Sequence, residues 1–192
     1  MSDLEAAVAT GVLGADEAHR ALLQATVEVA RDLLGKVIRY GAASARIVET
    51  EAYLPTDDGA AHSARGRTPR TSVIFGPPGR AYVYLIYGMH YCLNVVAERE
   101  GVAGCVLIRA VEPIAGVMHL SNGPGKLTRA LGITLEHYGA DLTRGPLTIH
   151  APAGNENFDI VTSPRIGINK SADLPLRYFI RGNRFVSREP RR

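Results

Sequence analysis

Charged side chains inside two apolar, strand-like runs are the feature that most constrains how this chain can fold. The first run is Arg46-Ile-Val-Glu-Thr-Glu-Ala-Tyr53, and the period of two along a strand places Glu49 and Glu51 on one face with Ile47 and Tyr53. The second run, residues 106–111, carries Arg109 among Val, Leu, Ile and Ala. Because a buried charge is costly unless it is paired, we expect the fold to bring Arg109 against Glu51 or Glu49.

The other strand and helix signals predict an α+β fold. Apolar alternation predicts strands over 36–40, 45–53, 81–86, 90–97, 104–111, 146–150, 158–161 and 177–181. Apolar residues near 3.6 spacing predict a helix over 16–34, a second helix follows residues 122–126, and residues 54–80 are expected to be a loop. We therefore expect a single mixed domain with a curved, mainly antiparallel sheet, in which 104–111 pairs with 90–97. Helices should lie at its flank, and an aromatic β-hairpin should protrude at residues 86–88.

Length and cysteine usage favour an ordinary intracellular protein. The 192 residues suit one domain spanning 1–192, with residues 1–20 as a flexible or helical extension. Cys92 and Cys105 lie in apolar runs without CxxC spacing, which favours buried free thiols over a disulfide. The N-terminus lacks the pattern of a signal peptide, and no apolar run approaches the ~20 residues of a membrane span. We expect a cytoplasmic location and no membrane contact.

The net charge of +3 is distributed unevenly. Residues 1–34 hold six acids and two bases, whereas residues 165–192 hold eight bases against Asp173 and Glu189. This asymmetry favours a face that binds a polyanion, and a solvated arginine-rich tail is the alternative. The stretch 59–97 has no acid, and its arginines suit phosphate contacts. They are Arg65, Arg67, Arg70 and Arg80.

A glycine-rich turn before the second helix offers another place for phosphate. Gly123 and Gly125 precede Lys126, and a helix start presents free backbone N–H groups and the positive end of its dipole. The spacing differs from that of a P-loop, so nucleoside triphosphate binding is not expected. The histidines and cysteines also lack metal-ligand spacing, so we expect no metal site.

The two strand acids supply the candidate chemistry. A pair such as Glu49 and Glu51 suggests an O-glycosidase, because those enzymes use two carboxylates. Acids at i and i+2 of one strand point the same way, however, whereas an O-glycosidase flanks its bond from two sides. One catalytic carboxylate and one structural acid is the simpler hypothesis.

Tyrosines make up most of the aromatic content, with eight Tyr, four Phe and no Trp. Tyr82, Tyr84, Tyr87 and Tyr91 fall within ten residues, and an ordinary strand core would explain them. Tyr87 differs because it stands beside Gly88 at the expected turn. An exposed ring at a hairpin tip can enter a stack of nucleic-acid bases.

Six motifs follow one another at separate positions along the chain. They are Val29-Ala-Arg-Asp-Leu-Leu-Gly-Lys36, Arg46-Ile-Val-Glu-Thr-Glu-Ala-Tyr-Leu54, Ala60-Ala-His-Ser63, residues 82–94 (YVYLIYGMHYCLN), Leu107-Ile-Arg-Ala-Val-Glu-Pro113 and Asn122-Gly-Pro-Gly-Lys-Leu127. Together they resemble the alkyladenine (3-methyladenine) DNA glycosylase family over about residues 25–186. The resemblance implies a monofunctional hydrolase without metal or cofactor that initiates base excision repair. Its implied partner is double-stranded DNA containing 3-methyladenine or 7-methylguanine, with hypoxanthine left open as a further substrate.

The resemblance also implies roles for individual residues. Glu51 matches the general base that activates the hydrolytic water, and Arg109 matches the arginine that helps to hold that water and the carboxylate. Tyr87 matches the hairpin tyrosine that fills the gap left by the extruded base. The implied base pocket comprises Tyr53, His62, Tyr84, Asn94, Ile166 and Ile168, and Asn94 is expected to disfavour guanine. From the charge pattern, DNA-backbone contacts are expected at Arg65, Arg67, Arg70, Gly123, Gly125 and Lys126.

Two other functions stay open. A basic face with aromatic side chains would also serve a non-catalytic nucleic-acid-binding module. A lyase acting through a Schiff base would need Lys36, Lys126 or Lys170, and phosphate binding explains Lys126 better. The connection between Pro113 and Asn122 is shorter than in many family members, which bears on DNA or partner contacts rather than on chemistry. We expect a monomer.

Overall fold

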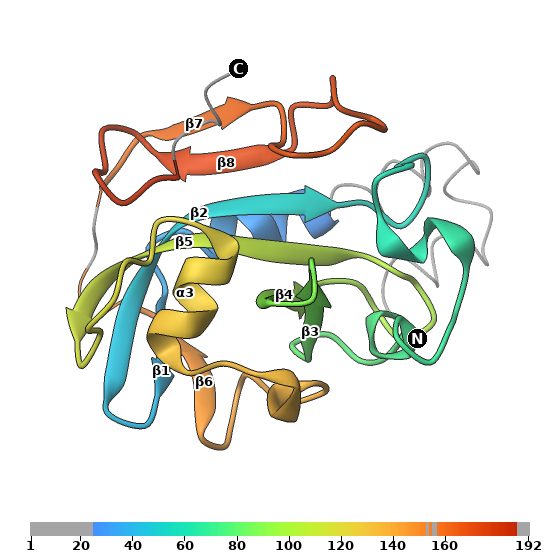
Figure 1. Cartoon of the computed structure of the whole chain (residues 1–192). Coiled ribbons are helices and arrows are strands. Elements are labelled where there is room, and N and C mark those ends of the chain that lie inside the picture. Colours follow the sequence, from blue (N-terminus) through green and yellow to red (C-terminus); the bar gives the residue numbers. More distant parts are fainter. Residues whose placement is uncertain (1–24, 153, 155–156, 188–192) are drawn as a thin grey trace.

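The computed structural model describes residues 25–152, 154 and 157–187, and its strands join in one antiparallel sheet. The order along the main path is β3-β4-β5-β2-β1-β6, while β8 pairs with both β2 and β7 (Figure 1). The strands are β1 (Val37–Tyr40), β2 (Ala43–Tyr53), β3 (Ala81–Ile86), β4 (His90–Val96), β5 (Cys105–Ala115), β6 (Leu147–His150), β7 (Ile160–Ser163) and β8 (Arg177–Ile180). The predicted α+β class with a curved antiparallel sheet is confirmed.

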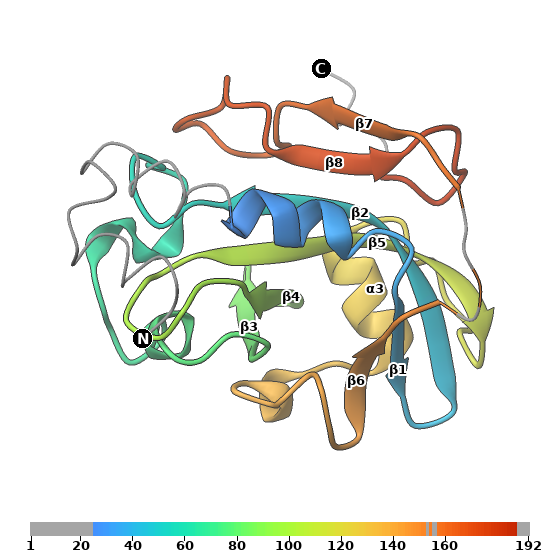
Figure 2. The ribbon, with the colours of Figure 1, turned by 180° about the vertical axis from the view of Figure 1, so that it is seen from behind.

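Two helices cover opposite faces of the long β2–β5 pair (Figures 1 and 2). Residues 25–32 form the described part of the first predicted helix, and the hydroxyl of Thr50 on β2 donates to the Ala30 carbonyl at 2.7 Å. The rest of that prediction, residues 16–24, and the proposed extension over 1–20 lie outside the described residues. The second helix, α3 (Pro124–Leu131), packs on β4 and β5 and buries Leu127 and Leu131.

The element boundaries agree closely with those expected from the sequence. β5 runs further than predicted, to Ala115, and pairs antiparallel with β4 as expected. The expected loop over 54–80 contains two short 3-10 helices, η1 (His62–Arg65) and η2 (Ser72–Phe75), and a third, η3 (Leu135–His137), follows α3. Cys92 and Cys105 are free and buried, as predicted. Within the described ranges, no helix is long and apolar enough to cross a membrane.

Two bulges aim the charged side chains of the central strands. The pairing of β2 with β5 shifts register on either side of Glu49, which leaves Val48 as an extra residue on β2 and Arg109 as an extra residue on β5. Bulges bend a strand and redirect its side chains. The predicted period of two is therefore interrupted between Ile47 and Glu49. Glu49 and Glu51 still share a face, because both carboxylates contact the guanidinium of Arg109.

Candidate active site

A cavity of about 310 Å³ opens where the β3–β4 hairpin, the centre of β5, the start of α3 and residues 166–168 meet. Its wall contains every residue predicted for the base pocket. These are Tyr53, His62, Tyr84, Asn94, Ile166 and Ile168, joined by Tyr87 and Arg109. The rest of the wall is formed by Ala60, Tyr82, Ile86, Cys92, Cys105, Leu107, Pro124 and Gly167.

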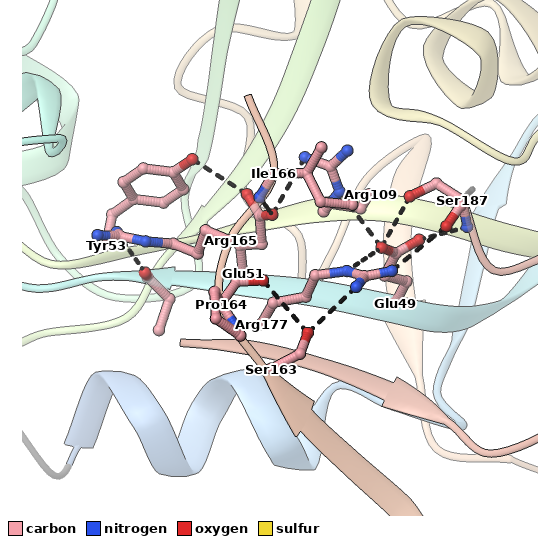
Figure 3. Close-up of polar contacts among 11 residues, drawn as sticks. Glu49, Glu51, Tyr53, Arg109, Ser163, Pro164, Arg165, Ile166, Arg177 and Ser187 are labelled. Carbon is pink, nitrogen blue, oxygen red and sulfur yellow. Dashed lines mark hydrogen bonds and ion pairs between the residues drawn. The ribbon is translucent and has the colours of Figure 1, made fainter. Parts of the chain in front are cut away.

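Glu51 is fixed directly behind this wall by three donors (Figure 3). Its Oε1 accepts from the Ile166 backbone N–H at 2.8 Å and lies 3.2 Å from Arg109 Nη1. Its Oε2 accepts from the Tyr53 hydroxyl at 3.1 Å. All three donors belong to cavity-lining residues, while Glu51 itself is fully buried. The arrangement holds one carboxylate in a single orientation directly behind the cavity wall.

The partners of Glu51 keep the ionisation states that this arrangement requires. Burial, and after it the negative charge of Glu51, raises the pKa of the Tyr53 hydroxyl, so that Tyr53 stays protonated and can donate. Burial alone would lower the pKa of Arg109, but Glu51 and Glu49 outweigh burial and raise it. Arg109 therefore stays cationic beside the carboxylate.

Glu49 belongs to an adjoining internal network that shares Arg109 with Glu51 (Figure 3). It is fully buried and accepts from Arg177 Nε at 2.6 Å and from the backbone N–H and hydroxyl of Ser187 at 2.7 and 2.8 Å. Arg109 Nε lies 3.4 Å from the same carboxylate. Neither acid lines the cavity itself, but the donors that Glu49 does not share with Glu51, Arg177 and Ser187, lie away from the cavity wall, which fits the structural role expected for the second acid.

A buried ion pair that sequence reasoning missed holds the far side of the site. Arg165 donates two hydrogen bonds to the Asp58 carboxylate, at 2.6 and 2.8 Å, and both side chains are fully buried. Arg165 also donates to the Ala52 carbonyl at 2.9 Å, and its guanidinium lies 4.6 Å from the centre of the Tyr53 ring. The ion pair anchors the segment that carries the Ile166 N–H to Glu51.

His62, Tyr82 and Tyr84 form one continuous aromatic wall. The His62 ring meets the Tyr84 ring edge-on at 4.6 Å between centroids, and its Nδ1 lies 2.8 Å from the Tyr82 hydroxyl. Burial lowers the pKa of His62, with a smaller contribution from Arg70, and burial raises the pKa of Tyr82 to about 12 and that of Tyr84 as well. These rings are therefore uncharged near neutral pH. Asn94 Nδ2 donates to the Tyr82 carbonyl at 3.0 Å, which fixes its amide at the cavity.

The tip of the β3–β4 hairpin presents Tyr87 to solvent. The Met89 N–H donates to the Ile86 carbonyl at 3.2 Å, and the two residues between them, Tyr87 and Gly88, have φ values of 53° and 70°. Positive φ at both central positions is what a type I′ turn requires, and it is unfavourable for tyrosine. Tyr87 nevertheless occupies this position with 83% of its surface exposed, next to the cavity.

The start of α3 contacts β4 of the same hairpin, next to the turn. A Cβ at Gly125 would lie 2.9 Å from the Cβ of His90, and neither atom could move without its backbone. We expect Gly125→Ala to destabilise the protein by about 1–3 kcal/mol because of this overlap. Urea denaturation measures the effect. The opposite sign, a gain of up to about 1 kcal/mol as for an exposed helical position, would show that α3 and the hairpin are not in tight contact.

The cationic residues divide into exposed and internal ones. Arg65, Arg67, Arg70 and Lys126 are exposed, and the N-cap residue of α3, Gly123, provides no side-chain cap for the backbone N–H groups of the helix. The predicted polyanion-binding face over 165–192 is wrong in part, because Arg165 and Arg177 are buried ion-pair partners. The arginines at 188, 191 and 192 lie outside the described residues.

Comparison with known proteins places the chain in a family. Residues 20–184 match the family model described as methylpurine-DNA glycosylase (MPG). Relatives provisionally named 3-methyladenine DNA glycosylases include one from Rhodopseudomonas palustris (strain HaA2), 47% identical over 97% of this chain and 98% of the relative. Another, from Methanoculleus marisnigri, is 48% identical over 85% of this chain and 94% of its own length. The chain therefore belongs to the methylpurine-DNA glycosylase family.

Proposed function

We propose that this chain cuts the N-glycosidic bond of a damaged purine extruded from duplex DNA, with Glu51 activating the attacking water. Its family membership makes it a DNA-3-methyladenine glycosylase, an N-glycosyl hydrolase of base excision repair. The observation that carries the mechanism is the Glu51 carboxylate, held directly behind the wall of an aromatic cavity by three residues that line it. About 310 Å³ lies at the small end of ligand pockets, which suits a single base rather than a larger ligand.

The reaction begins with extrusion, because the target bond of a stacked base is out of reach. Glu51 takes a proton from water as the water oxygen bonds to the sugar C1′. The C1′–N bond breaks, and its electron pair goes to the purine, which leaves as the free base. For an alkylated purine this electron pair neutralises the positive charge of the ring, so a single base catalyst suffices. A neutral purine such as hypoxanthine needs a proton on the departing ring.

The shape of the cavity supports selection of damaged purines. Tyr53 supplies one flat face, and the joined rings of His62 and Tyr84 supply another. Stacking on such faces favours electron-poor rings, and cationic alkylated purines gain further from the π-face. Asn94 presents its amide at the cavity, where its Nδ2, a donor held by the Tyr82 carbonyl, would meet the exocyclic amine of guanine, which is also a donor. 7-Methylguanine carries the same amine, but its positively charged ring stacks more strongly and leaves more readily than guanine does. The proposed substrates are 3-methyladenine and 7-methylguanine, with hypoxanthine as a neutral substrate.

Tyr87 should fill the gap that the extruded base leaves in the duplex while that base is in the cavity. We expect Tyr87→Ala to weaken binding to a duplex with one damaged purine about 5- to 150-fold, since stacking on one base is worth roughly 1–3 kcal/mol. Fluorescence anisotropy measures this binding. Tyr87→Phe keeps the ring and should bind as the unmodified protein does. Equal binding by the alanine variant would remove Tyr87 from this role.

Detection of free base separates the proposal from its alternatives. The enzyme should release free base from methylated duplex DNA, by chromatography of the supernatant, and leave an unbroken strand with an abasic site. A non-catalytic module would bind the same DNA and release nothing. A lyase would give a protein–DNA adduct on borohydride reduction, and within the described residues none of Lys36, Lys126 and Lys170 lines the cavity.

A further inference from the structure

Arg70 lies behind the aromatic wall of the cavity. Its guanidinium carbon is 5.0 Å from the centre of the Tyr84 ring. Arg70 does not belong to the cavity wall; it lines one neighbouring surface hollow with His62 and another with Tyr84. The guanidinium therefore approaches Tyr84 from the side that faces away from the cavity.

The loop that carries Arg70 is held by Tyr138, a partly buried residue whose ring packs against the same wall. The Tyr138 hydroxyl lies 3.2 Å from the carbonyls of both Pro69 and Arg70. The Tyr138 ring meets the Tyr82 ring edge-on at 6.3 Å. These contacts hold the backbone at Arg70 close to the aromatic wall.

Arg70 is exposed, and among the described residues its charge faces solvent rather than a carboxylate. Across the described ranges no acid pairs with Arg70, and the stretch 59–97 contains neither Asp nor Glu. The contrast is Arg165, which lies behind Tyr53 at 4.6 Å but is neutralised by Asp58. Among the described residues, Arg165 on Tyr53 is thus paired with a carboxylate, whereas Arg70 on Tyr84 is not.

We propose that Arg70 sets the charge selectivity of the cavity by weakening the binding of cationic purines relative to that of neutral purines. A ring attracts a cation through the negative charge on its π-face, but a second cation on the opposite face repels the first across the ring. A neutral purine does not experience this repulsion. 7-Methylguanine is cationic in DNA, whereas hypoxanthine and ethenoadenine are neutral. Arg70 would thereby reduce the ratio of the base-release rate for 7-methylguanine to the rates for these neutral lesions. This inference rests on the proposed function.

Single-turnover base release from matched duplexes tests it, with one duplex carrying 7-methylguanine and the other hypoxanthine or ethenoadenine. Arg70→Met removes the charge and keeps most of the side-chain length. We expect it to raise the ratio of the cationic to the neutral rate about three- to tenfold, a range set by screened repulsion over two side-chain layers. Arg70→Lys keeps a charge and should keep the ratio closer to that of the unmodified enzyme. Higher salt should reduce the difference between Arg70→Met and the unmodified enzyme.

Arg67→Met is the matched control, because Arg67 is an exposed arginine of the same loop that no cavity tyrosine contacts. If it binds phosphate, its loss lowers both rates by the same factor and leaves the ratio unchanged. If Arg70→Met also lowered both base-release rates by the same factor and left their ratio unchanged, Arg70 would be a phosphate contact. That result would overturn the inference about Arg70 but not the proposed function. An unmodified enzyme that releases none of these bases would instead overturn the proposed function, and the inference with it.

Discussion

Glu51→Gln should lower the single-turnover rate of base release about 10³-fold or more while leaving duplex binding within a few-fold of the unmodified enzyme. Loss of a general base costs roughly 10²–10⁴ in rate, and the amide cannot accept the proton of water. The substitution keeps the size of the side chain, and its oxygen can still accept from the Ile166 N–H. Rates come from quenched-flow release of base, and binding from anisotropy on the same duplex.

Glu49→Gln is the matched control for this prediction. Glu49 is also a fully buried acid of β2 and also contacts Arg109, but its other donors, Arg177 and Ser187, do not line the cavity. Glu51 is instead held by Tyr53 and Ile166, which do line it. We expect it to lower stability, because Arg177 loses its charged partner, and to retain most of the chemical rate of the folded protein. If the two variants lost activity equally, or if Glu51→Gln released base at the normal rate, Glu51 would not be the general base.

Asp58→Ala should destabilise the protein by about 3–5 kcal/mol, because removing one member of a buried ion pair leaves the other charge uncompensated. Arg165 is fully buried beside Asp58 and has no access to water. The Leu54 and Ala60 N–H groups also lose their acceptor, since Asp58 accepts from them at 3.0 and 3.1 Å. Urea denaturation monitored by circular dichroism gives the free energy of unfolding.

A double variant separates the lost ion pair from the lost packing. In Asp58→Ala/Arg165→Leu neither charge of this ion pair remains buried, so we expect the double variant to be more stable than the sum of the single losses predicts. The segment 165–168 would still be displaced, and base release should stay low because the Ile166 N–H no longer orients Glu51. A loss below about 1 kcal/mol for Asp58→Ala would match an exposed pair and contradict this account of the site.

The sequence allowed the sheet and the pairing of acids with Arg109 to be predicted, because both follow from local patterns. Strand runs report their period directly, and a guanidinium in an apolar strand demands a carboxylate. The bulges at Val48 and Arg109 were not predictable, since they depend on how β2 and β5 align with each other. The Val48 bulge also interrupts the period of two between Ile47 and Glu49, which the sequence predicts to share a face.

The Asp58–Arg165 ion pair shows the second limit. The two residues are 107 positions apart, and each stands in a loop-like segment without an apolar period. Nothing local distinguishes Arg165 from the exposed arginines of the C-terminal stretch, so the charge pattern predicts a polyanion-binding face that includes it. The charge pattern likewise predicts a DNA-backbone contact at Arg70, and only the three-dimensional structure places its guanidinium against Tyr84.

Product analysis with the unmodified enzyme tests the central claim most directly. Duplexes carrying 3-methyladenine, 7-methylguanine, hypoxanthine or ethenoadenine are incubated with excess enzyme, and free base, strand breaks and borohydride-trapped adducts are measured together. The account predicts free alkylated purine, an abasic site in an unbroken strand and no trapped adduct. Release of no base from any duplex, or a trapped protein–DNA adduct, would contradict hydrolysis by a water activated at Glu51.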